Sequence, residues 1–127
     1  MAKREIIGGP DIMQHSQPFP TAVRVGNMVF SSAVGGDDVP DHSVPEDIET
    51  QVANAFEQMR RIMEKAGGST DGIGKVSVML KSRDDRKYVN PVWIEMFPDE
   101  NDRPVRHTSE HNLVGGRLIQ LEFIGVV

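Results

Sequence analysis

The 127-residue sequence predicts an α+β fold, with one mixed β-sheet and two helices packed on one face of it. Between residues 48 and 66 the apolar side chains recur every three or four positions, which is the spacing of an amphipathic helix. Residues 75–81 alternate between polar and apolar side chains, as a strand with one buried face does. Glycine-interrupted β-rich runs near both ends predict hairpins, and the length favours a single domain over residues 1–127.

The N-terminal part of the sequence predicts three short strands. Ile6 and Ile7 belong to the first, which Gly8-Gly9-Pro10 would interrupt. Residues 22–25 and 28–32 are predicted to form a hairpin around Gly26-Asn27, where a glycine in the first position suits a type II′ turn. Residues 35–45 are typical of a turn-rich loop.

The first helix has recognisable start and stop signals. Ser43-Val44-Pro45-Glu46 matches a capping box, which predicts that the helix follows directly. Gly67-Gly68 ends it, because glycine adopts the conformation that terminates helices. The apolar positions on its inner face are Ile48, Val52, Ala55, Phe56, Met59, Ile62, Met63 and Ala66.

A second helix is predicted to begin near Asp84 and to end at Pro98. Since the residue before a proline avoids the helical conformation, we expect a break at Asn90, before Pro91. The side chains expected to turn inward are Val89, Val92, Trp93, Met96 and Phe97.

The last two strands are predicted over about residues 105–113 and 117–126, as a hairpin around Gly115-Gly116. Apart from the short strand at Ile6 and Ile7, the order of elements is then β, β, α, β, α, β, β, with every strand in the same mixed sheet.

Composition limits the classes of function. The formal net charge of −5 and the scattered basic residues make nucleic acid an unlikely partner, because phosphate backbones are held by clustered Lys and Arg. The absence of cysteine excludes disulfides, a thiolate nucleophile and cysteine-ligated metals. With no apolar run long enough for a membrane span or a signal peptide, we expect a soluble cytoplasmic protein.

Metal and triad chemistry receive little support. His107 and His111 lie four residues apart, but no carboxylate-rich cluster accompanies them, so we expect no metal site. A combination of Ser31 or Ser32 with Asp37 and His107 lacks the turn that exposes a nucleophilic serine.

Arg106 is the most informative polar residue, because a long cation is seldom placed on a half-buried strand without a partner. Strand alternation puts Thr108 and Glu110 on its face, with His107 and Ser109 on the other. Its planar guanidinium suits a carboxylate ligand. The alternative, favoured by periodicity alone, is a salt bridge to Glu110, Glu122 or Asp102.

Several short segments occur in an order and spacing that one known family shares: Pro18-Phe19, Gly26-Asn27-Met28-Val29-Phe30-Ser31-Ser32, Gln51, Ala66-Gly67-Gly68, Val89-Asn90, Met96-Phe97, Pro104-Val105-Arg106 and Gln120-Leu121-Glu122. On these segments the chain resembles the YjgF/YER057c/UK114 family, also called the Rid or reactive-intermediate-deaminase family. The resemblance runs from about residue 18 to the end.

The resemblance implies a chorismate-mutase-like α+β subunit that assembles as a homotrimer, with ligand clefts at the subunit interfaces. It implies a hydrolase that converts reactive enamines and imines, such as those released by pyridoxal-phosphate dehydratases, to 2-oxo acids and ammonia. It further implies no metal or organic cofactor. The implied partner is a small carboxylate-bearing metabolite, with no membrane.

The resemblance also assigns roles to residues. Arg106 matches the family arginine that holds the substrate carboxylate, and Asn90 matches the asparagine of the family's Val-Asn motif. Ser32 matches a serine near the cleft, and Thr108 takes the place of a cysteine that faces the ligand in many members.

The departures from the family pattern concern catalysis. Phe19 stands where deaminating members often have tyrosine, and Ala33-Val34 replaces Gly-Gln. Gln120 stands where active members have a glutamate thought to position or activate water, and glutamine cannot exchange a proton at neutral pH. Glu122 shares the face of Gln120 and could substitute, or it could match a second family glutamate away from the chemistry.

Three functions remain open. The first is an enamine or imine deaminase with Gln120 and Glu122 as the catalytic pair. The second is a catalytically weak trimer of the same family that binds a carboxylate metabolite. The third, the ribonuclease activity attached to the family name endoribonuclease L-PSP, is least favoured because the chain is acidic. The identity of the substrate is not predicted.

Overall fold

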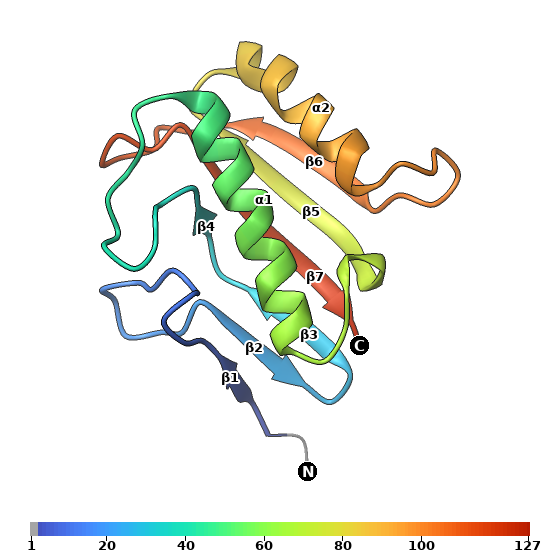
Figure 1. Cartoon of the computed structure of the whole chain (residues 1–127). Coiled ribbons are helices and arrows are strands. Elements are labelled where there is room, and N and C mark those ends of the chain that lie inside the picture. Colours follow the sequence, from blue (N-terminus) through green and yellow to red (C-terminus); the bar gives the residue numbers. More distant parts are fainter. Residues whose placement is uncertain (1–2) are drawn as a thin grey trace.

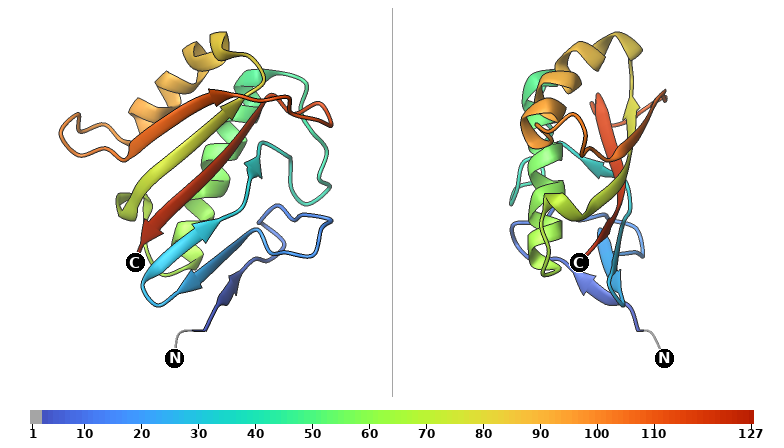
Figure 2. Two further views of the ribbon diagram at one scale, coloured as in Figure 1. Left: turned by 180° about the vertical axis from the view of Figure 1, so that it is seen from behind. Right: turned by 90° about the vertical axis from the view of Figure 1, so that its right-hand side faces the viewer.

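A seven-stranded mixed sheet forms one layer of the molecule, and two α-helices cover one face of it (Figures 1 and 2). This is the predicted α+β architecture. The structure, a computed structural model, describes residues 3–127, so the first two residues of the predicted domain lie outside the described residues. The elements are β1 (Glu5–Ile7), β2 (Ala22–Val25), β3 (Met28–Ser31), β4 (Val34–Gly35), α1 (Ile48–Lys65), η1 (Thr70–Gly72), β5 (Ile73–Leu80), η2 (Arg83–Asp85), α2 (Arg86–Met96), β6 (Val105–Glu110) and β7 (Ile119–Val126).

The N-terminal strands β1, β2 and β3 pair in antiparallel fashion, as predicted. Val25 pairs with Met28, so the loop of the hairpin is Gly26-Asn27. Gly26 has a φ of +60°, which a residue with a side chain adopts only with strain. The prediction of a glycine-first turn is therefore confirmed.

The predicted hairpin between the last two strands is wrong, because β5 lies between them. The order of strands in the sheet is β1-β2-β3-β7-β5-β6, with β4 paired to β7. β6 runs parallel to β5, and α2 connects the two, since parallel neighbours need a crossover that a tight turn cannot provide. Both strands are also shorter than predicted, and Gly115-Gly116 belongs to a longer connection over residues 111–118.

The first helix begins later than the capping box indicates. Asp47 is the N-cap residue, and its carboxylate accepts a hydrogen bond of 2.9 Å from the Thr50 backbone N–H. Ser43 instead donates to the Asp41 carboxylate, so the predicted box is wrong. The predicted end is confirmed, since Gly67 has a φ of +94° and the Gly68 N–H donates to the Met63 carbonyl.

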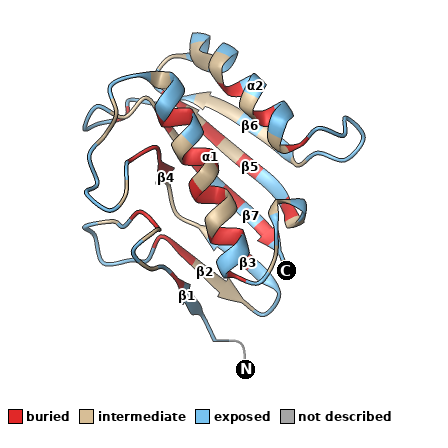
Figure 3. Ribbon diagram, in the orientation of Figure 1, coloured by how far each residue is buried: buried red, intermediate tan, exposed pale blue. Residues whose placement is uncertain are grey.

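The core lies between the sheet and the helices, as the burial colours of Figure 3 show. Except for the half-buried Ile48, the predicted inner residues of α1 are buried, and they meet the alternate residues of β5 and β7. The buried strand residues on this face are Ile73, Val76, Val78, Leu80, Ile119, Leu121 and Phe123.

The predicted break at Asn90 is wrong, because α2 continues through Pro91. Pro91 has no N–H to donate, so the Lys87 carbonyl lacks its usual hydrogen bond within the helix. Both residues lie on the exposed side of the helix. Water can satisfy that carbonyl, and the buried side chains Val89, Trp93 and Phe97 hold the other side. Packing thus overrides the local preference before proline.

Two long connections are tied to α1 and to each other. Gln51 is fully buried, and its amide donates to the carbonyls of Pro45 and Gly116 at 2.7 and 3.0 Å and accepts from the Leu118 N–H at 2.8 Å. The buried Asp37 forms an ion pair of 2.7 Å with Arg117. These contacts fix β4 and the residues before β7. No helix among the described residues is long and apolar enough to cross a membrane.

Candidate functional site

Arg106 lies under α2, on the face of the sheet that the helices cover. Its neighbour across the sheet is the buried Val76, and Thr108 on the same face pairs with Val78, which confirms the predicted faces of β6. Arg106 Nη2 donates a hydrogen bond of 2.8 Å to Asn90 Oδ1. Its guanidinium carbon lies 5.1 Å from the centre of the Trp93 ring, in a cation–π contact. We call Arg106, Asn90 and Trp93 the arginine cluster.

The charge of Arg106 has no carboxylate partner within residues 3–127. No Asp or Glu oxygen lies within 4.0 Å of it, so the predicted alternative of a salt bridge is not observed there. Glu110 instead accepts a hydrogen bond of 3.0 Å from the Arg83 backbone N–H. Burial lowers the pKa of the Arg106 guanidinium from its ordinary value, and the nearby charge of Arg86 lowers it further. An anionic ligand beside the guanidinium would raise its pKa again.

A second group of predicted site residues lies at the end of β3, and we call it the serine cluster: Ser32, His15 and Phe19. The Ser32 hydroxyl donates to the Thr21 carbonyl at 2.9 Å, and it lies 2.7 Å from His15 Nε2. Because the single hydroxyl proton points to Thr21, His15 donates to Ser32. The Phe19 ring lies 4.9 Å from the His15 ring. No sequence pattern indicates His15, since it is 17 residues from Ser32 in an irregular segment.

Gln120 and Glu122 lie on the open face of the sheet. Gln120 pairs with Met79 of β5 and with Gly35 of β4, and Glu122 pairs with Ser77. Glu122 and Ser77 line a hollow of about 250 Å³ on this face. His107, which pairs with Ser77, also lies on the open face and so points away from the arginine cluster.

The predicted site residues therefore do not converge within one chain. The arginine cluster and Thr108 lie on the helix-covered face near the sheet edge that β6 forms, whereas Gln120 and Glu122 lie on the open face. β3, which leads to Ser32, is three strand positions from β6, which corresponds to about 14 Å.

Metal ligation finds no support in the part of the chain that the structure describes, residues 3–127. No group of three or more His, Asp or Glu side chains there could hold an ion. His111 lies 2.8 Å from the Ser109 hydroxyl through Nε2, on the exposed end of β6.

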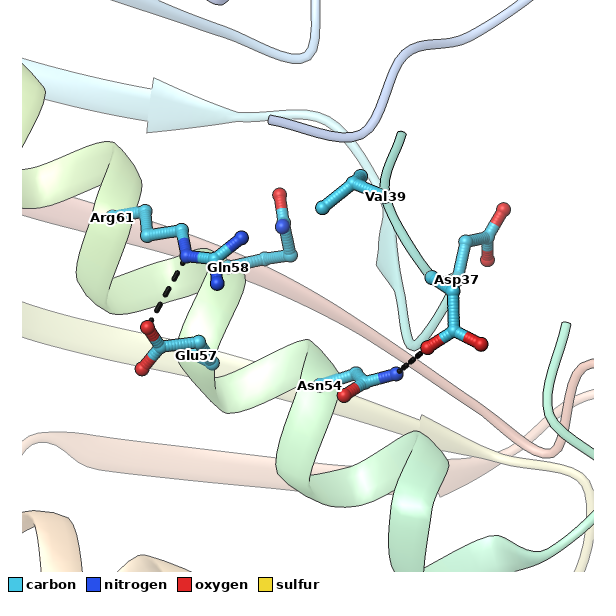
Figure 4. Close-up of a pocket in the computed structure, with 7 residues that line it drawn as sticks. Asp37, Val39, Asn54, Glu57, Gln58 and Arg61 are labelled. Atoms are coloured by element: carbon cyan, nitrogen blue, oxygen red, sulfur yellow. Dashed lines mark hydrogen bonds and ion pairs between the residues drawn. The ribbon is translucent and has the colours of Figure 1, made fainter. Parts of the chain in front are cut away.

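A further hollow, of about 180 Å³, lies between α1 and the loop after β4 (Figure 4). Polar contacts within the hollow engage its acidic side chains: Asn54 donates to Asp38 at 2.8 Å, and Arg61 donates to Glu57 at 3.2 Å. None of the predicted site residues lines it.

Comparisons with known proteins agree with the fold. Residues 11–125 match the sequence profile of a family described as Endoribonuclease L-PSP. A RutC family protein of Pyrococcus abyssi is 32% identical over 109 residues, which cover 84% of this chain and 84% of that protein. A 2-iminobutanoate/2-iminopropanoate deaminase of Dermatophagoides farinae is 29% identical over 109 residues, which cover 85% of this chain and 84% of that protein. The crystal structure of RidA from an Antarctic Psychrobacter species superposes with a TM-score of 0.90 at 26% identity, covering 98% of this chain and 100% of that chain.

Proposed function

Because the chain belongs to the Endoribonuclease L-PSP family, also known as the YjgF or Rid family, we propose that it hydrolyses reactive 2-imino and 2-amino-enoic acids. The relative named as a 2-iminobutanoate/2-iminopropanoate deaminase supports this class of reaction. A 2-amino-enoic acid first tautomerises to the 2-imino acid by moving a proton from nitrogen to carbon. Water then adds to the C=N carbon, and the resulting intermediate expels ammonia to leave a 2-oxo acid. The balance is one water consumed and one ammonia released, so the reaction requires neither an oxidant nor a reductant.

The unpaired charge of Arg106 is the observation that carries this proposal. A half-buried guanidinium without a carboxylate partner within the described residues is costly unless a ligand neutralises it. Asn90 and Trp93 hold it in place, so it can meet a substrate carboxylate with little loss of freedom. Thr108 lies on the same face of β6 and would contact the rest of the substrate.

The cleft would form between subunits of a homotrimer. This proposal follows from the separation of the predicted site residues, since one chain cannot bring the serine cluster to its own Arg106 without rearranging the sheet. The open face supplies an apolar surface for a second copy, because its strands expose large side chains over 36–74% of their area. These side chains are Ile6, Met28, Phe30, Val105, Ile124 and Val126.

Water would be placed by Gln120, Glu122 or both. Free imines already hydrolyse in water, so a glutamine that orients the nucleophile can give a useful rate without exchanging a proton. In the serine cluster, Ser32 has one lone pair left after its contacts with His15 and Thr21. That lone pair can accept from the N–H of an imine or enamine. We expect this reaction to take place in the cytoplasm.

The alternative is a trimer of the same family that binds a carboxylate metabolite without efficient turnover. Gln120 favours it, because the position lacks the carboxylate that could take a proton from water and return it to the leaving amine. Both functions use Arg106 in the same way.

A semicarbazide-competition assay tests the proposal. Amino acid oxidase generates 2-imino acids, and the decrease in semicarbazone formation reports their hydrolysis by wild-type protein or Arg106→Ala. We expect acceleration by the wild type and a loss of about 100-fold in the variant, since a bidentate charged contact is removed. Lys87→Ala, which removes an exposed cation one turn from Asn90, is the control and should retain full activity.

Sedimentation of each variant shows whether it keeps the assembly state of the wild type. If wild-type protein in its normal assembly state hydrolyses none of the imines, the deaminase proposal is rejected and the binding protein is favoured. Equal activity of wild type and Arg106→Ala would reject the role of Arg106 in both.

A further inference from the structure

We propose that the natural substrate carries two carboxylates, and that Arg86 binds the second one beside the carboxylate held by Arg106. This inference rests on the proposed function, because it takes Arg106 as the holder of the first carboxylate. It defines the substrate class as dicarboxylic 2-imino acids. These carry one more carboxylate than 2-imino acids with an uncharged side chain.

The geometry of α2 places Arg86 on the same side of the helix as Asn90 and Trp93 of the arginine cluster. Arg86, Asn90 and Trp93 are four and seven residues apart, a spacing that aligns side chains along one face of a helix. Asn90 and Trp93 both contact Arg106. Arg86 therefore continues the same stripe toward the start of the helix, next to the end of the strand that carries Arg106.

The side chain of Arg86 has donors to spare. Its Nε donates to the Arg83 carbonyl at 3.1 Å, which fixes the base of the guanidinium. No carboxylate oxygen within residues 3–127 lies within 4.0 Å of it, although Asp84 and Asp85 precede it in the chain. Glu110, at the end of the neighbouring strand, faces the Arg83 backbone N–H. The two terminal nitrogens of Arg86 thus remain available to an anion.

The start of α2 does not favour a cation at the position of Arg86. This residue stands in the first turn of α2, where the partial positive charge of the helix disfavours a cation. Its charge is also close enough to Arg106 to lower the pKa of that residue, after the effect of burial. Helix stability therefore does not account for an arginine at this position, whereas a ligand with two negative groups relieves both repulsions.

A matched pair of ligands tests the second carboxylate by binding alone. 2-Oxoglutarate and 2-oxopentanoate have the same number of carbons and differ in the terminal carboxylate. By calorimetry we expect wild type to bind 2-oxoglutarate at least 10-fold more tightly, since a charge-assisted contact is added. Arg86→Gln should remove this preference while leaving the affinity for 2-oxopentanoate within about twofold. Lys87→Gln removes the same charge from the adjacent residue of the same helix and should keep the preference.

The outcomes separate this inference from the proposed function. Equal binding of the two ligands by wild type, or equal effects of Arg86→Gln and Lys87→Gln, would overturn the role of Arg86. Turnover is then compared for 2-iminoglutarate and 2-iminopentanoate, generated by oxidases from glutamate and norvaline. Hydrolysis of both at the same kcat/KM would overturn the dicarboxylate while the deaminase stands. A preference for 2-oxoglutarate that depends on Arg86, without any imine hydrolysis, would support the dianion site and reject the deaminase.

Discussion

The arginine cluster and the serine cluster differ in how far the protein itself satisfies their polar groups. Ser32 uses its proton on the Thr21 carbonyl and receives one from His15, so little of its hydrogen-bonding capacity is open. Arg106 has one protein acceptor, Asn90, for five N–H groups and no counter-charge within the described residues. An incompletely satisfied charge indicates a ligand more directly than a satisfied hydroxyl does, because leaving it unpaired costs free energy.

The largest effect is expected from adding a carboxylate at position 120, which lies on the open face of the sheet and belongs to neither cluster. Gln120→Glu should raise kcat for imine hydrolysis by about 100-fold, because a positioned carboxylate can act as general base and acid. Steady-state kinetics in the semicarbazide assay measures it. Glu122→Gln is the matched control on the same face, and a loss of activity there would show that Glu122 already does this work.

A carboxylate placed inside the arginine cluster should neutralise Arg106, so that the protein itself satisfies the polar groups of both clusters. Asn90→Asp keeps the shape of the side chain and puts a negative charge about where the Asn90 oxygen lies, 2.8 Å from Arg106. We expect affinity for 2-oxopentanoate to fall by about 10-fold or more, because the internal carboxylate competes with the ligand. Calorimetry measures the affinity, and thermal unfolding should show an unchanged or slightly higher Tm. The control Asn90→Ala, which adds no charge, should weaken binding less. Wild-type affinity in Asn90→Asp would contradict the unpaired state of Arg106.

The serine cluster should show a smaller and coupled effect. Ser32→Ala and His15→Ala are each expected to lower kcat/KM by about 3- to 10-fold, the range of one neutral hydrogen bond. Because His15 acts through Ser32, the double variant should be no worse than Ser32→Ala alone. His15→Gln, which retains an N–H donor, should restore part of the activity. Additive losses would mean that His15 contacts the substrate by itself.

The smallest effect is expected at a charge far from both clusters. In the folded chain the pKa of Asp47 lies below its ordinary value of 3.8, because the Thr50 side chain and backbone donate to its carboxylate. A lowered pKa adds stability above the unfolded value, and this contribution is lost as the pH falls through the folded value. Asp47→Asn should therefore lower the Tm by a few degrees at pH 7, and the difference should shrink as the pH falls below 3.8. A difference in Tm that does not shrink as the pH is lowered would assign the effect to shape rather than to charge. Neither cluster should change its ligand affinity at pH 7.

Sequence patterns predicted the elements whose signals are local. The α1 stripe, the Gly26-Asn27 hairpin and the two faces of β6 all depend on side chains within a few residues of one another. The pairing of β6 with β5 depends instead on which strands become neighbours in the sheet, and no local pattern encodes that. The predicted break before Pro91 failed for the same reason, since buried contacts on the other side of α2 outweigh a local preference.

The candidate site divides in the same way. Alternation along the strand placed Arg106 and Thr108 on one face, but the contacts with Asn90 and Trp93 arise from the packing of α2 on the sheet. His15 lies in a segment without periodicity, so only the folded chain brings it to Ser32. The separation of Gln120 and Glu122 from Arg106 also required the sheet order, because the three positions are close in the sequence.

The central position of β7 affects how the protein can be synthesised. This strand leaves the ribosome after β3, β4 and β5, yet it pairs with all three and so joins the two halves of the sheet. Until it emerges, β3 and β5 each present an unpaired edge, and α1 lacks much of the surface on which it packs. At roughly 5–20 residues added per second, the nascent chain spends seconds in this incomplete state. We therefore expect the growing chain to depend on chaperones that shield exposed strand edges. A ribosome-stalled chain that lacks residues 119–126 should be far more sensitive to protease than one in which β7 has emerged.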